Sequence, residues 1–326
     1  MFLYTKGMLA PIQIVEVSPR DGLQNEKGFV ATADKLALIG RLIAMGARRI
    51  EVASFVNPRR VPQMADAEDV VAGLPDVPGV RFIGLCLNER GVDRAIASRD
   101  RPGKASGRGL DEAGCVLVAT DGFGIANQGQ TVVEGIAANT VMLAKAKAAG
   151  LFAQVTISAS FGCPYEGRVS PRHIVDLAAR MVDAGAREIA LADTIGVAVP
   201  NQVGDLVGAV MARIGDIPVR LHLHDTRGLA PANAWAGYDA GCRIFDSALG
   251  GLGGCPFAPG AAGNVGTEEL VYLFERSGVA SDYDLDKAVA ANRWFATVMG
   301  RELPSRVGKA GDFAIKGSKV PMRAAS

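Results

Sequence analysis

The chain has 326 residues with a formal net charge of +1, and 49% of the residues are hydrophobic while 21% are charged. This composition provides enough apolar side chains for one large α/β domain or two average ones. The near-neutral charge gives no sign of a nucleic acid or an acidic membrane surface as a partner.

The cysteines and the N-terminus indicate the compartment. Five cysteines are scattered along the chain without metal-ligand spacing. An odd, dispersed set of this kind predicts reduced thiols in a cytoplasmic protein. The opening stretch MFLYTKGMLAP is too short for the apolar region of a signal peptide or for a membrane span. We therefore expect a soluble cytoplasmic protein with no membrane partner.

Short apolar segments rich in Val and Ile alternate with amphipathic patterns along the chain. Eight segments predict strands, at residues 12–17, 49–53, 80–87, 115–119, 154–160, 188–193, 219–224 and 243–248. The stretches AMGARRIEV, DAGAREIAL and DAGCRIFD repeat the same order of helix end, glycine and strand start. Such recurrence is typical of successive βα units.

Two of the intervening helices have recognisable ends. Thr32 predicts the N-cap of a helix that continues through Met45, just before a glycine. Ser170 and Pro171 predict the cap and first residue of another helix, which ends at Gly185.

Eight βα units without a break in composition predict an α/β fold, a closed (β/α)8 TIM barrel with additional C-terminal helices. An open doubly wound sheet is the alternative, but the loop VSPRDGLQNEKG after the first strand is not a glycine-rich phosphate turn. We expect a single catalytic domain over residues 1–326, with a barrel core at 12–274 and a helical extension and tail at 275–326.

The segment RLHLHDTRG at residues 220–228 contains two of the three histidines of the chain. Because alternate residues of a strand face the same side, His222 and His224 should project together, about 6–7 Å apart along the strand. This arrangement suits a shared metal ion, although two buried, hydrogen-bonded imidazoles are the commoner explanation of an isolated pair. The third histidine, His173, lies at a helix start, and we interpret it as a surface residue.

Active sites of such barrels form at the C-terminal ends of the strands. The polar residues expected at this rim are Arg20, Asp21, Gln24, Glu51, Asp193, Thr194, His222, His224, Cys255 and Asn264. Each alone has a structural explanation, so the prediction of a site depends on their convergence. Two imidazoles, a carboxylate from Asp21 and a carbonyl oxygen from Asn264 suit six-coordinate Mg²⁺ or Mn²⁺, with Zn²⁺ or Co²⁺ as alternatives.

Six segments carry a resemblance to a known family: VEVSPRDGLQNEK, IEVASFVNPRRVPQMAD, FGCPYEGRVSP, ADTIGVAVP, HLHDTRG and GGLGGCPFAPGAAGNVGTEELVYL. From about Ile12 to Phe274 the chain resembles the 3-hydroxy-3-methylglutaryl-CoA lyases, metal-dependent TIM-barrel enzymes with an Arg-Asp motif after the first strand. The resemblance implies metal-assisted retro-Claisen cleavage of (3S)-3-hydroxy-3-methylglutaryl-CoA to acetyl-CoA and acetoacetate, as in leucine catabolism and ketone-body formation. It also implies an acyl-CoA substrate and a homodimer.

The resemblance further implies a role for each rim residue. The metal ligands would be Asp21, His222, His224 and Asn264, and the bound cation would lower the pKa of the substrate hydroxyl. Either Asp193 or His222 would accept the hydroxyl proton.

The departing fragment of this reaction is a thioester enolate. Arg20 would stabilise its negative charge, and Cys255 would return a proton to its carbon. Glu51 would orient Arg20 or a metal-bound water. The substrate-binding residues would be Gln24, Ser54, Thr194, Arg227 and Asn127.

Two segments depart from the pattern of the family. After the fourth strand, ATDGFGIANQGQTVVE replaces a Ser/Thr-Phe-Ser/Thr-Lys-x-Asn-like segment, so Asp121, Asn127 and Gln128 would shape a different acyl-CoA pocket. The family often has Tyr where this chain has Arg227, which would bind a carboxylate or a CoA phosphate, or face solvent. These differences leave room for a related substrate, such as citramalyl-CoA or a longer branched 3-hydroxyacyl-CoA.

Three other functions stay open. An isopropylmalate-synthase-like enzyme would run a Claisen condensation, but such relatives lack the Gly-Gly-Cys-Pro loop and usually have a regulatory domain. A two-histidine, one-carboxylate iron oxygenase matches the count of Asp21, His222 and His224. A binding protein would keep the barrel without its chemistry.

Overall fold

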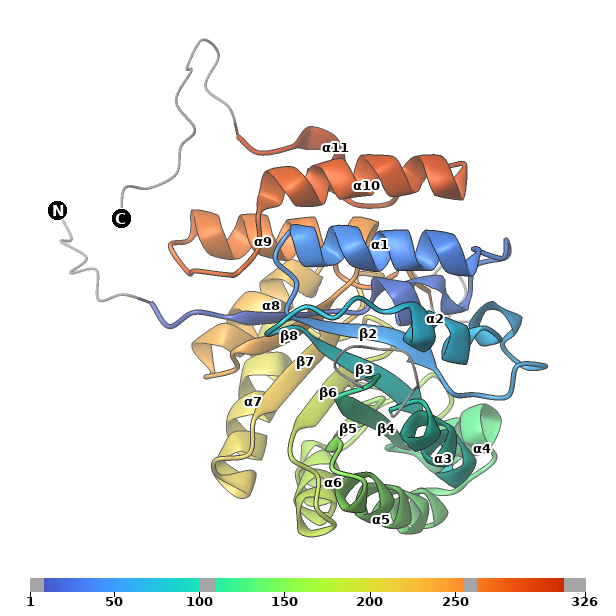
Figure 1. Cartoon of the computed structure of the whole chain (residues 1–326). Helices are drawn as coiled ribbons and strands as arrows, with labels where there is room; N and C mark the ends of the chain where they lie inside the picture. The colour runs from blue at the N-terminus through green and yellow to red at the C-terminus, as the bar shows by residue number, and fades with distance from the viewer. Residues whose placement is uncertain (1–8, 100–108, 255–262, 314–326) are drawn as a thin grey trace, which may run out of the picture.

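The computed structural model describes residues 9–99, 109–254 and 263–313. Eight parallel strands form a closed barrel in chain order, and β1 pairs with β8 to complete it (Figure 1). The strands are β1 Gln13–Glu16, β2 Arg49–Ser54, β3 Arg81–Cys86, β4 Glu112–Val118, β5 Phe152–Ser158, β6 Ile189–Asp193, β7 Val219–Leu223 and β8 Ile244–Ser247. All eight predicted strands are present, and the predicted TIM barrel is confirmed.

All eight strands differ from their predicted boundaries by at least one residue, and the start of β4 differs most. β4 begins at Glu112 rather than at Cys115. The apolar pattern does not mark the stretch EAG as a strand, but Glu112 is fully buried because Arg49 of β2 forms a salt bridge with it, with 2.6 Å between Nη2 and Oε2. A charged residue can lie inside the barrel when its partner is also there, and the apolar pattern of a single strand does not reveal this.

Helices surround the barrel and cover its outer face (Figure 1). They are α1 Thr32–Ala44, α2 Ala67–Gly73, α3 Glu89–Ala97, α4 Asp121–Gln128, α5 Val132–Ala148, α6 Pro171–Asp183, α7 Pro200–Ile214, α8 Ala230–Asp239, α9 Thr267–Arg276, α10 Leu285–Met299 and α11 Arg306–Ala310. Three short helical segments are η1 Ser18–Gly22, η2 Pro62–Met64 and η3 Leu249–Gly251. The predicted C-terminal helices are present, and α10 packs against both α1 and α9.

The structure corrects one predicted helix cap. Ala31, not Thr32, is the N-cap of α1, and the Thr32 hydroxyl instead donates to Asp66 Oδ2 at 2.7 Å. Thr32 is the first residue inside the helix, and its hydroxyl contacts the N-cap residue of α2. Ser170 is the N-cap of α6, and Pro171 is its first residue, as predicted, although the Ser170 side chain makes no capping hydrogen bond. Gly185 follows that helix with a φ of 107°, a left-handed conformation that glycine adopts at little cost.

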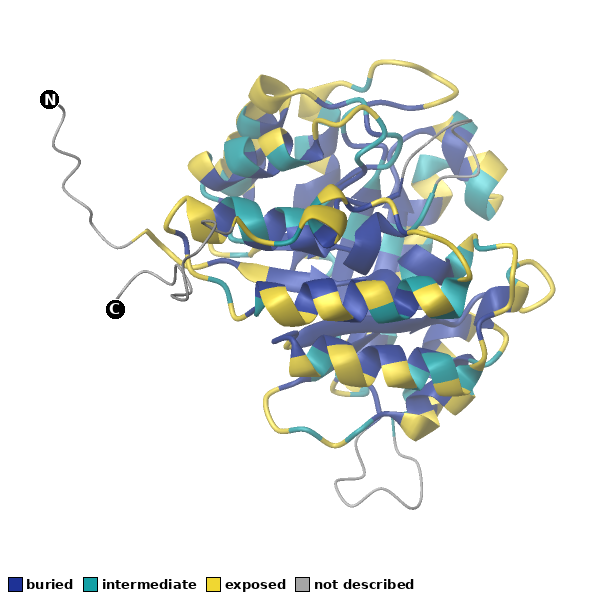
Figure 2. Ribbon diagram, turned by 90° about the horizontal axis from the view of Figure 1, so that it is seen from above, coloured by how far each residue is buried: buried dark blue, intermediate teal, exposed yellow. Residues whose placement is uncertain are grey.

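Burial follows the expected pattern of a barrel. Figure 2 shows buried residues on the strands and on the inner faces of the helices, with exposed residues on the outer helix faces. None of the helices in residues 9–99, 109–254 and 263–313 combines the length and apolar character that a membrane span requires. The division into a core at 12–274 and an extension at 275–326 stays a prediction.

Candidate active site

A cavity of about 700 Å³ lies at the C-terminal ends of the strands. The residues that line it come from the barrel interior and from the loops that follow the strands. Eight of the predicted site residues line this cavity: Arg20, Asp21, Gln24, Glu51, Asn127, Thr194, His222 and His224. The convergence expected from the direction of the parallel strands is therefore present in the structure.

The loop after β1 folds into η1, a single turn of π-helix, which holds Arg20 and Asp21 at the rim. The backbone N–H groups of Arg20, Asp21 and Gly22 all donate to the carbonyl of Val17, at 3.2, 2.8 and 3.2 Å. Such single-turn π-helices are frequent at functional sites. Here the turn fixes the position of two adjacent charged side chains.

Three side chains that could bind a metal ion lie close together at η1: Asp21, His222 and His224. The Nε2 atoms of His222 and His224 are 3.1 Å apart, and Asp21 Oδ2 lies 4.0 and 3.9 Å from them respectively. Adjacent ligands of a six-coordinate Mg²⁺ or Mn²⁺ ion are about 3 Å apart. The two imidazole nitrogens already have this spacing, and the Asp21 carboxylate would supply a third ligand.

Asn264 lies next to this cluster, since it forms an isolated β-bridge with His224. Its Nδ2 donates to Asp21 Oδ2 at 2.7 Å and to the Leu252 carbonyl at 3.1 Å. Its buried Oδ1 has no hydrogen-bond partner among the described residues. A buried amide oxygen without a partner is costly, and a cation would remove that cost. These residues therefore fit a divalent metal ion.

The charges of the cluster suit metal binding. Burial by itself raises the pKa of Asp21, but the positive charge of Arg20, helped by His222 and by the hydrogen bond from Asn264, outweighs this effect and holds the pKa well below its usual range. Burial and the neighbouring His222 lower the pKa of His224 to about 4, so this imidazole is neutral at pH 7. A carboxylate anion and a neutral imidazole are the forms that bind metals.

Arg20 forms two ion pairs at the rim. Its Nη1 lies 2.5 Å from Asp21 Oδ1, and its Nη2 lies 2.7 Å from Glu51 Oε2 on β2. Burial opposes a charge on Arg20, but these two carboxylates raise its pKa above the usual value. The guanidinium is therefore a fixed cation beside the side chains of Asp21, His222 and His224. The contact with Glu51 agrees with the first of the two roles predicted for that carboxylate, the orientation of Arg20.

Asp193, one of the two candidates for the base, forms hydrogen bonds with the loop that follows β6. Its Oδ1 and Oδ2 accept hydrogen bonds from the backbone N–H groups of Val197 and Ala198, at 2.9 and 3.0 Å. Burial raises its pKa despite these two donors. Asp193 is not among the described residues that line the cavity, whereas His222 is. The choice between the two bases stays open.

Besides Asp193 and Asn264, two described residues of the prediction, Ser54 and Arg227, do not line the cavity. Ser54 is fully buried. Arg227 donates to the carbonyls of Ile195 and Gly196, at 3.1 and 2.8 Å, and so holds the loop after β6. Cys255 lies outside the described residues, and its neighbour Gly254 lines the cavity. The roles predicted for these three side chains stay predictions.

The interpretation of His173 as a surface residue is wrong. The residue is half-buried, and its Nε2 lies 2.9 Å from the carbonyl oxygen of Ala119. The His173 ring reaches the carbonyl of the residue that follows β4, a contact that the sequence pattern of the helix alone does not reveal.

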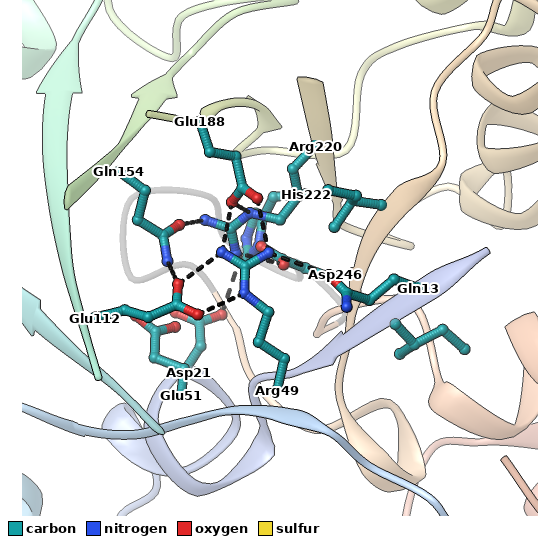
Figure 3. Close-up of polar contacts among 12 residues, drawn as sticks. Gln13, Asp21, Arg49, Glu51, Glu112, Gln154, Glu188, Arg220, His222 and Asp246 are labelled. Atoms are coloured by element: carbon teal, nitrogen blue, oxygen red, sulfur yellow. Dashed lines mark hydrogen bonds and ion pairs between the residues drawn. The ribbon is translucent and has the colours of Figure 1, made fainter. Parts of the chain in front are cut away.

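Sequence reasoning missed three polar residues at the base of the cavity: Gln154, Arg220 and Asp246. Asp246 of β8 lies 3.0 Å from His222, between its Oδ2 and Nδ1, and its Oδ1 accepts from Arg220 Nη1 at 2.6 Å (Figure 3). A signal was present in the sequence. Arg220 is a charge inside an apolar strand and shares a face with His222, and Asp246 is a carboxylate inside the next strand.

A closed (β/α)8 barrel with a carboxylate and two imidazoles at its C-terminal rim defines the class of metal-dependent barrel enzymes. Comparison with known proteins narrows this class. The sequence profile of the HMGL-like family matches residues 11–294. The chain therefore belongs to the HMGL-like family, and it is a carbon–carbon lyase.

Individual relatives cover almost the whole chain. It is 44% identical over 310 residues to (R)-citramalyl-CoA lyase of Chloroflexus aurantiacus, and the alignment covers 92% of this chain and 95% of that lyase. It is 37% identical over 295 residues to hydroxymethylglutaryl-CoA lyase of Bacillus subtilis, with 90% and 95% covered. An HMG-CoA lyase from Acinetobacter baumannii, solved with coenzyme A and 3-methylmalate, superposes with a TM-score of 0.88 at 36% identity, covering 98% and 100% of the two chains.

Proposed function

We propose that the protein cleaves a CoA thioester that carries a hydroxyl and a methyl group on its third carbon and ends in a carboxylate. The products would be acetyl-CoA and an oxo acid. The observation that carries this proposal is the cluster of Asp21, His222 and His224 within one cavity, beside the fixed cation of Arg20.

The residues at the rim would divide the work of a retro-Claisen reaction. Asp21, His222, His224 and the Oδ1 of Asn264 would hold a divalent cation, Mg²⁺ or Mn²⁺ by preference. When bound, that ion would polarise the substrate hydroxyl and lower its pKa. The hydroxyl proton would pass to Asp193, or to His222 only if the Nε2 of His222 is not bound to the ion.

Loss of that proton turns the carbinol oxygen into a carbonyl oxygen as the bond between the second and third carbons of the acyl chain breaks. The bonding electrons move to the second carbon and form the thioester enolate. Arg20 would stabilise the negative charge on the enolate oxygen, with Glu51 holding the guanidinium in place. The enolate carbon would then take a proton from Cys255, which completes acetyl-CoA.

Two acyl groups are candidates, and they differ by one methylene. In citramalyl-CoA the carboxylate is attached to the carbinol carbon, and the second product is pyruvate. In 3-hydroxy-3-methylglutaryl-CoA a methylene separates them, and the second product is acetoacetate. We propose citramalyl-CoA as the first substrate to test, because the Chloroflexus lyase is 44% identical to this chain while the Bacillus lyase is 37% identical. The 3-hydroxy-3-methylglutaryl thioester is the second substrate to test.

The test uses both thioesters with chelator-treated protein, to which Mg²⁺ or Mn²⁺ is restored. We expect metal-dependent release of acetyl-CoA together with pyruvate or acetoacetate, quantified by mass spectrometry. The variant Asp21→Asn should abolish release. If neither thioester is cleaved with either metal, the proposed function is wrong. Turnover with acetyl-CoA and a 2-oxo acid, or with iron, 2-oxoglutarate and oxygen, would instead support the condensing or oxygenase alternative.

Three further expectations belong to this proposal. We propose an acyl-CoA substrate, in line with the coenzyme A bound to the A. baumannii lyase. We also propose that the protein is cytoplasmic, has one catalytic domain and forms a homodimer. Light scattering of the purified protein tests the homodimer. A role in leucine catabolism or ketone-body formation follows only if the 3-hydroxy-3-methylglutaryl ester is the substrate.

A further inference from the structure

The imidazoles of His222 and His224 differ in their hydrogen bonds at Nδ1. His222 Nδ1 lies 3.0 Å from Asp246 Oδ2, whereas the buried Nδ1 of His224 has no hydrogen-bond partner among the described residues. Asp246 is 4% exposed, so its contact with His222 is sheltered from water. Asp246 therefore contacts His222 and leaves His224 without an equivalent partner among the described residues.

Both oxygens of Asp246 have a partner. Oδ2 faces His222, and Oδ1 accepts from Arg220 Nη1 at 2.6 Å (Figure 3). An ionised carboxylate only accepts hydrogen bonds, so it favours the form of His222 that carries a proton on Nδ1. The lone pair then lies on Nε2, the atom that faces His224 Nε2 at 3.1 Å and Asp21 Oδ2 at 4.0 Å. This is the atom that a metal ion would need.

Asp246 is itself fixed by a chain of buried polar groups across the barrel. Arg220 donates to Gln154 Oε1 and lies 3.0 Å from Glu188 Oε1 through its Nε. Gln154 Nε2 donates to Glu112 Oε2 at 2.8 Å. Glu112 lies on β4, Gln154 on β5 and Arg220 on β7, and Glu188 directly precedes β6. The orientation of Asp246 is therefore determined by the body of the barrel rather than by a loop.

From this arrangement we propose that Asp246 is a positioning residue, which fixes the ring orientation and tautomer of His222 so that Nε2 is the metal-binding atom, and that Arg220 holds Asp246 in place. This inference rests on the proposed metal centre. Carboxylates that accept from a metal-bound histidine commonly raise metal affinity by 10- to 100-fold.

The first test reads the tautomer in the metal-free wild-type protein, by ¹⁵N NMR of labelled histidine at a pH where the imidazoles are neutral. The chain has three histidines, and His173→Gln removes the one outside the cluster, which makes assignment direct. We expect a single Nδ1–H tautomer for His222. A His222 that carries its proton on Nε2 would overturn the inference, and this measurement requires no change at Asp246.

The second test measures the dissociation constant of Mn²⁺ by titration calorimetry. We expect Asp246→Asn to weaken binding by 10- to 100-fold. The control is Asp66→Asn, which removes a largely buried carboxylate that pairs with Lys35 and belongs neither to this chain of polar groups nor to the cavity wall, and it should change the constant by less than about threefold. Equal weakening in both variants, or no weakening in Asp246→Asn, would show a merely structural role and overturn the inference.

The two tests separate this inference from the proposed function. If the wild-type protein binds no Mn²⁺, Mg²⁺ or Zn²⁺, the proposed metal centre is wrong, and the role of Asp246 toward it is overturned as well. If the wild-type protein binds Mn²⁺ and cleaves a thioester while Asp246→Asn binds Mn²⁺ equally well, only the role of Asp246 is wrong.

Discussion

Replacement of Arg49 by methionine should strongly destabilise the barrel. Arg49 of β2 is nearly fully buried and pairs with two carboxylates across the interior. Its Nε and Nη2 donate to Glu112 at 2.8 and 2.6 Å, and its Nη1 and Nη2 donate to Glu188 at 2.7 and 3.0 Å. The guanidinium thus uses both of its forks, which is the geometry of strong charge-assisted hydrogen bonds.

The magnitude follows from what the substitution leaves behind. In Arg49→Met, Glu188 keeps Arg220 as a cation, but Glu112 keeps only Gln154 and the half-exposed Arg81, 3.1 Å away. Breaking a buried ion pair by removing one partner costs about 3–5 kcal/mol, because it strands the other charge. Total stabilities are about 5–15 kcal/mol, so the loss would be a large fraction of the whole.

The assay is urea unfolding followed by circular dichroism and tryptophan fluorescence, with coincident transitions required before free energies are compared. The control is Arg48→Met, which removes an exposed arginine from the preceding position and should change stability by less than about 0.5 kcal/mol. The double variant Arg49→Met/Glu112→Gln should be less destabilised than the sum of the single changes, because the stranded charge is gone. A loss below about 1 kcal/mol in Arg49→Met, or strict additivity, would refute this account of the interior.

Three other predictions follow from the site and its surroundings. Burial raises the pKa of Glu268 to about 8, so the protonated carboxyl is favoured in the folded state. The free energy of unfolding should therefore decline, by up to a few kcal/mol, as pH rises from about 4.5 to about 8. Glu268→Gln should lack this decline between about pH 5 and about pH 8 in urea titrations, and an unchanged slope would contradict the assignment. Arg20→Lys keeps a charge but loses the fork that contacts Asp21 and Glu51, so kcat for thioester cleavage should fall by about 10²–10³ with a smaller change in KM. An unaltered kcat would exclude Arg20 from enolate stabilisation. Asp21→Asn should weaken Mn²⁺ binding at least about tenfold in titration calorimetry, since the cluster loses its carboxylate ligand. Binding as tight as in the wild type would remove Asp21 from the ligand set.

Much of the fold and a large part of the site could be predicted from the sequence. The Val- and Ile-rich strands, and the glycines that follow the helices, are local signals, and each depends on residues only a few positions apart. Once eight parallel strands are established, their C-terminal ends must lie on one rim. That is why residues as far apart in the chain as Asp21 and His222 could be assigned to one site.

The contacts behind the rim could not be predicted in this way. The register of β7 against β8 pairs Leu221 with Phe245, which brings the next residues, His222 and Asp246, to the same level. A change of register by one residue would turn Asp246 to the other face of the sheet. Register depends on the closure of the whole barrel, so no pattern within either strand contains this information.

Asp193 illustrates the same limit. Its position at the end of β6 was predictable from the sequence, but the direction of its carboxylate depends on the backbone N–H groups of the following loop. The sequence by itself determined the strands, their order and the rim on which the reactive groups collect, because these follow from local apolar patterns and the direction of the chain. Only the tertiary structure decided which buried charges meet and which atom of each faces the cavity, because a side chain in the interior takes the partners that strand register and loop conformation place within hydrogen-bond distance.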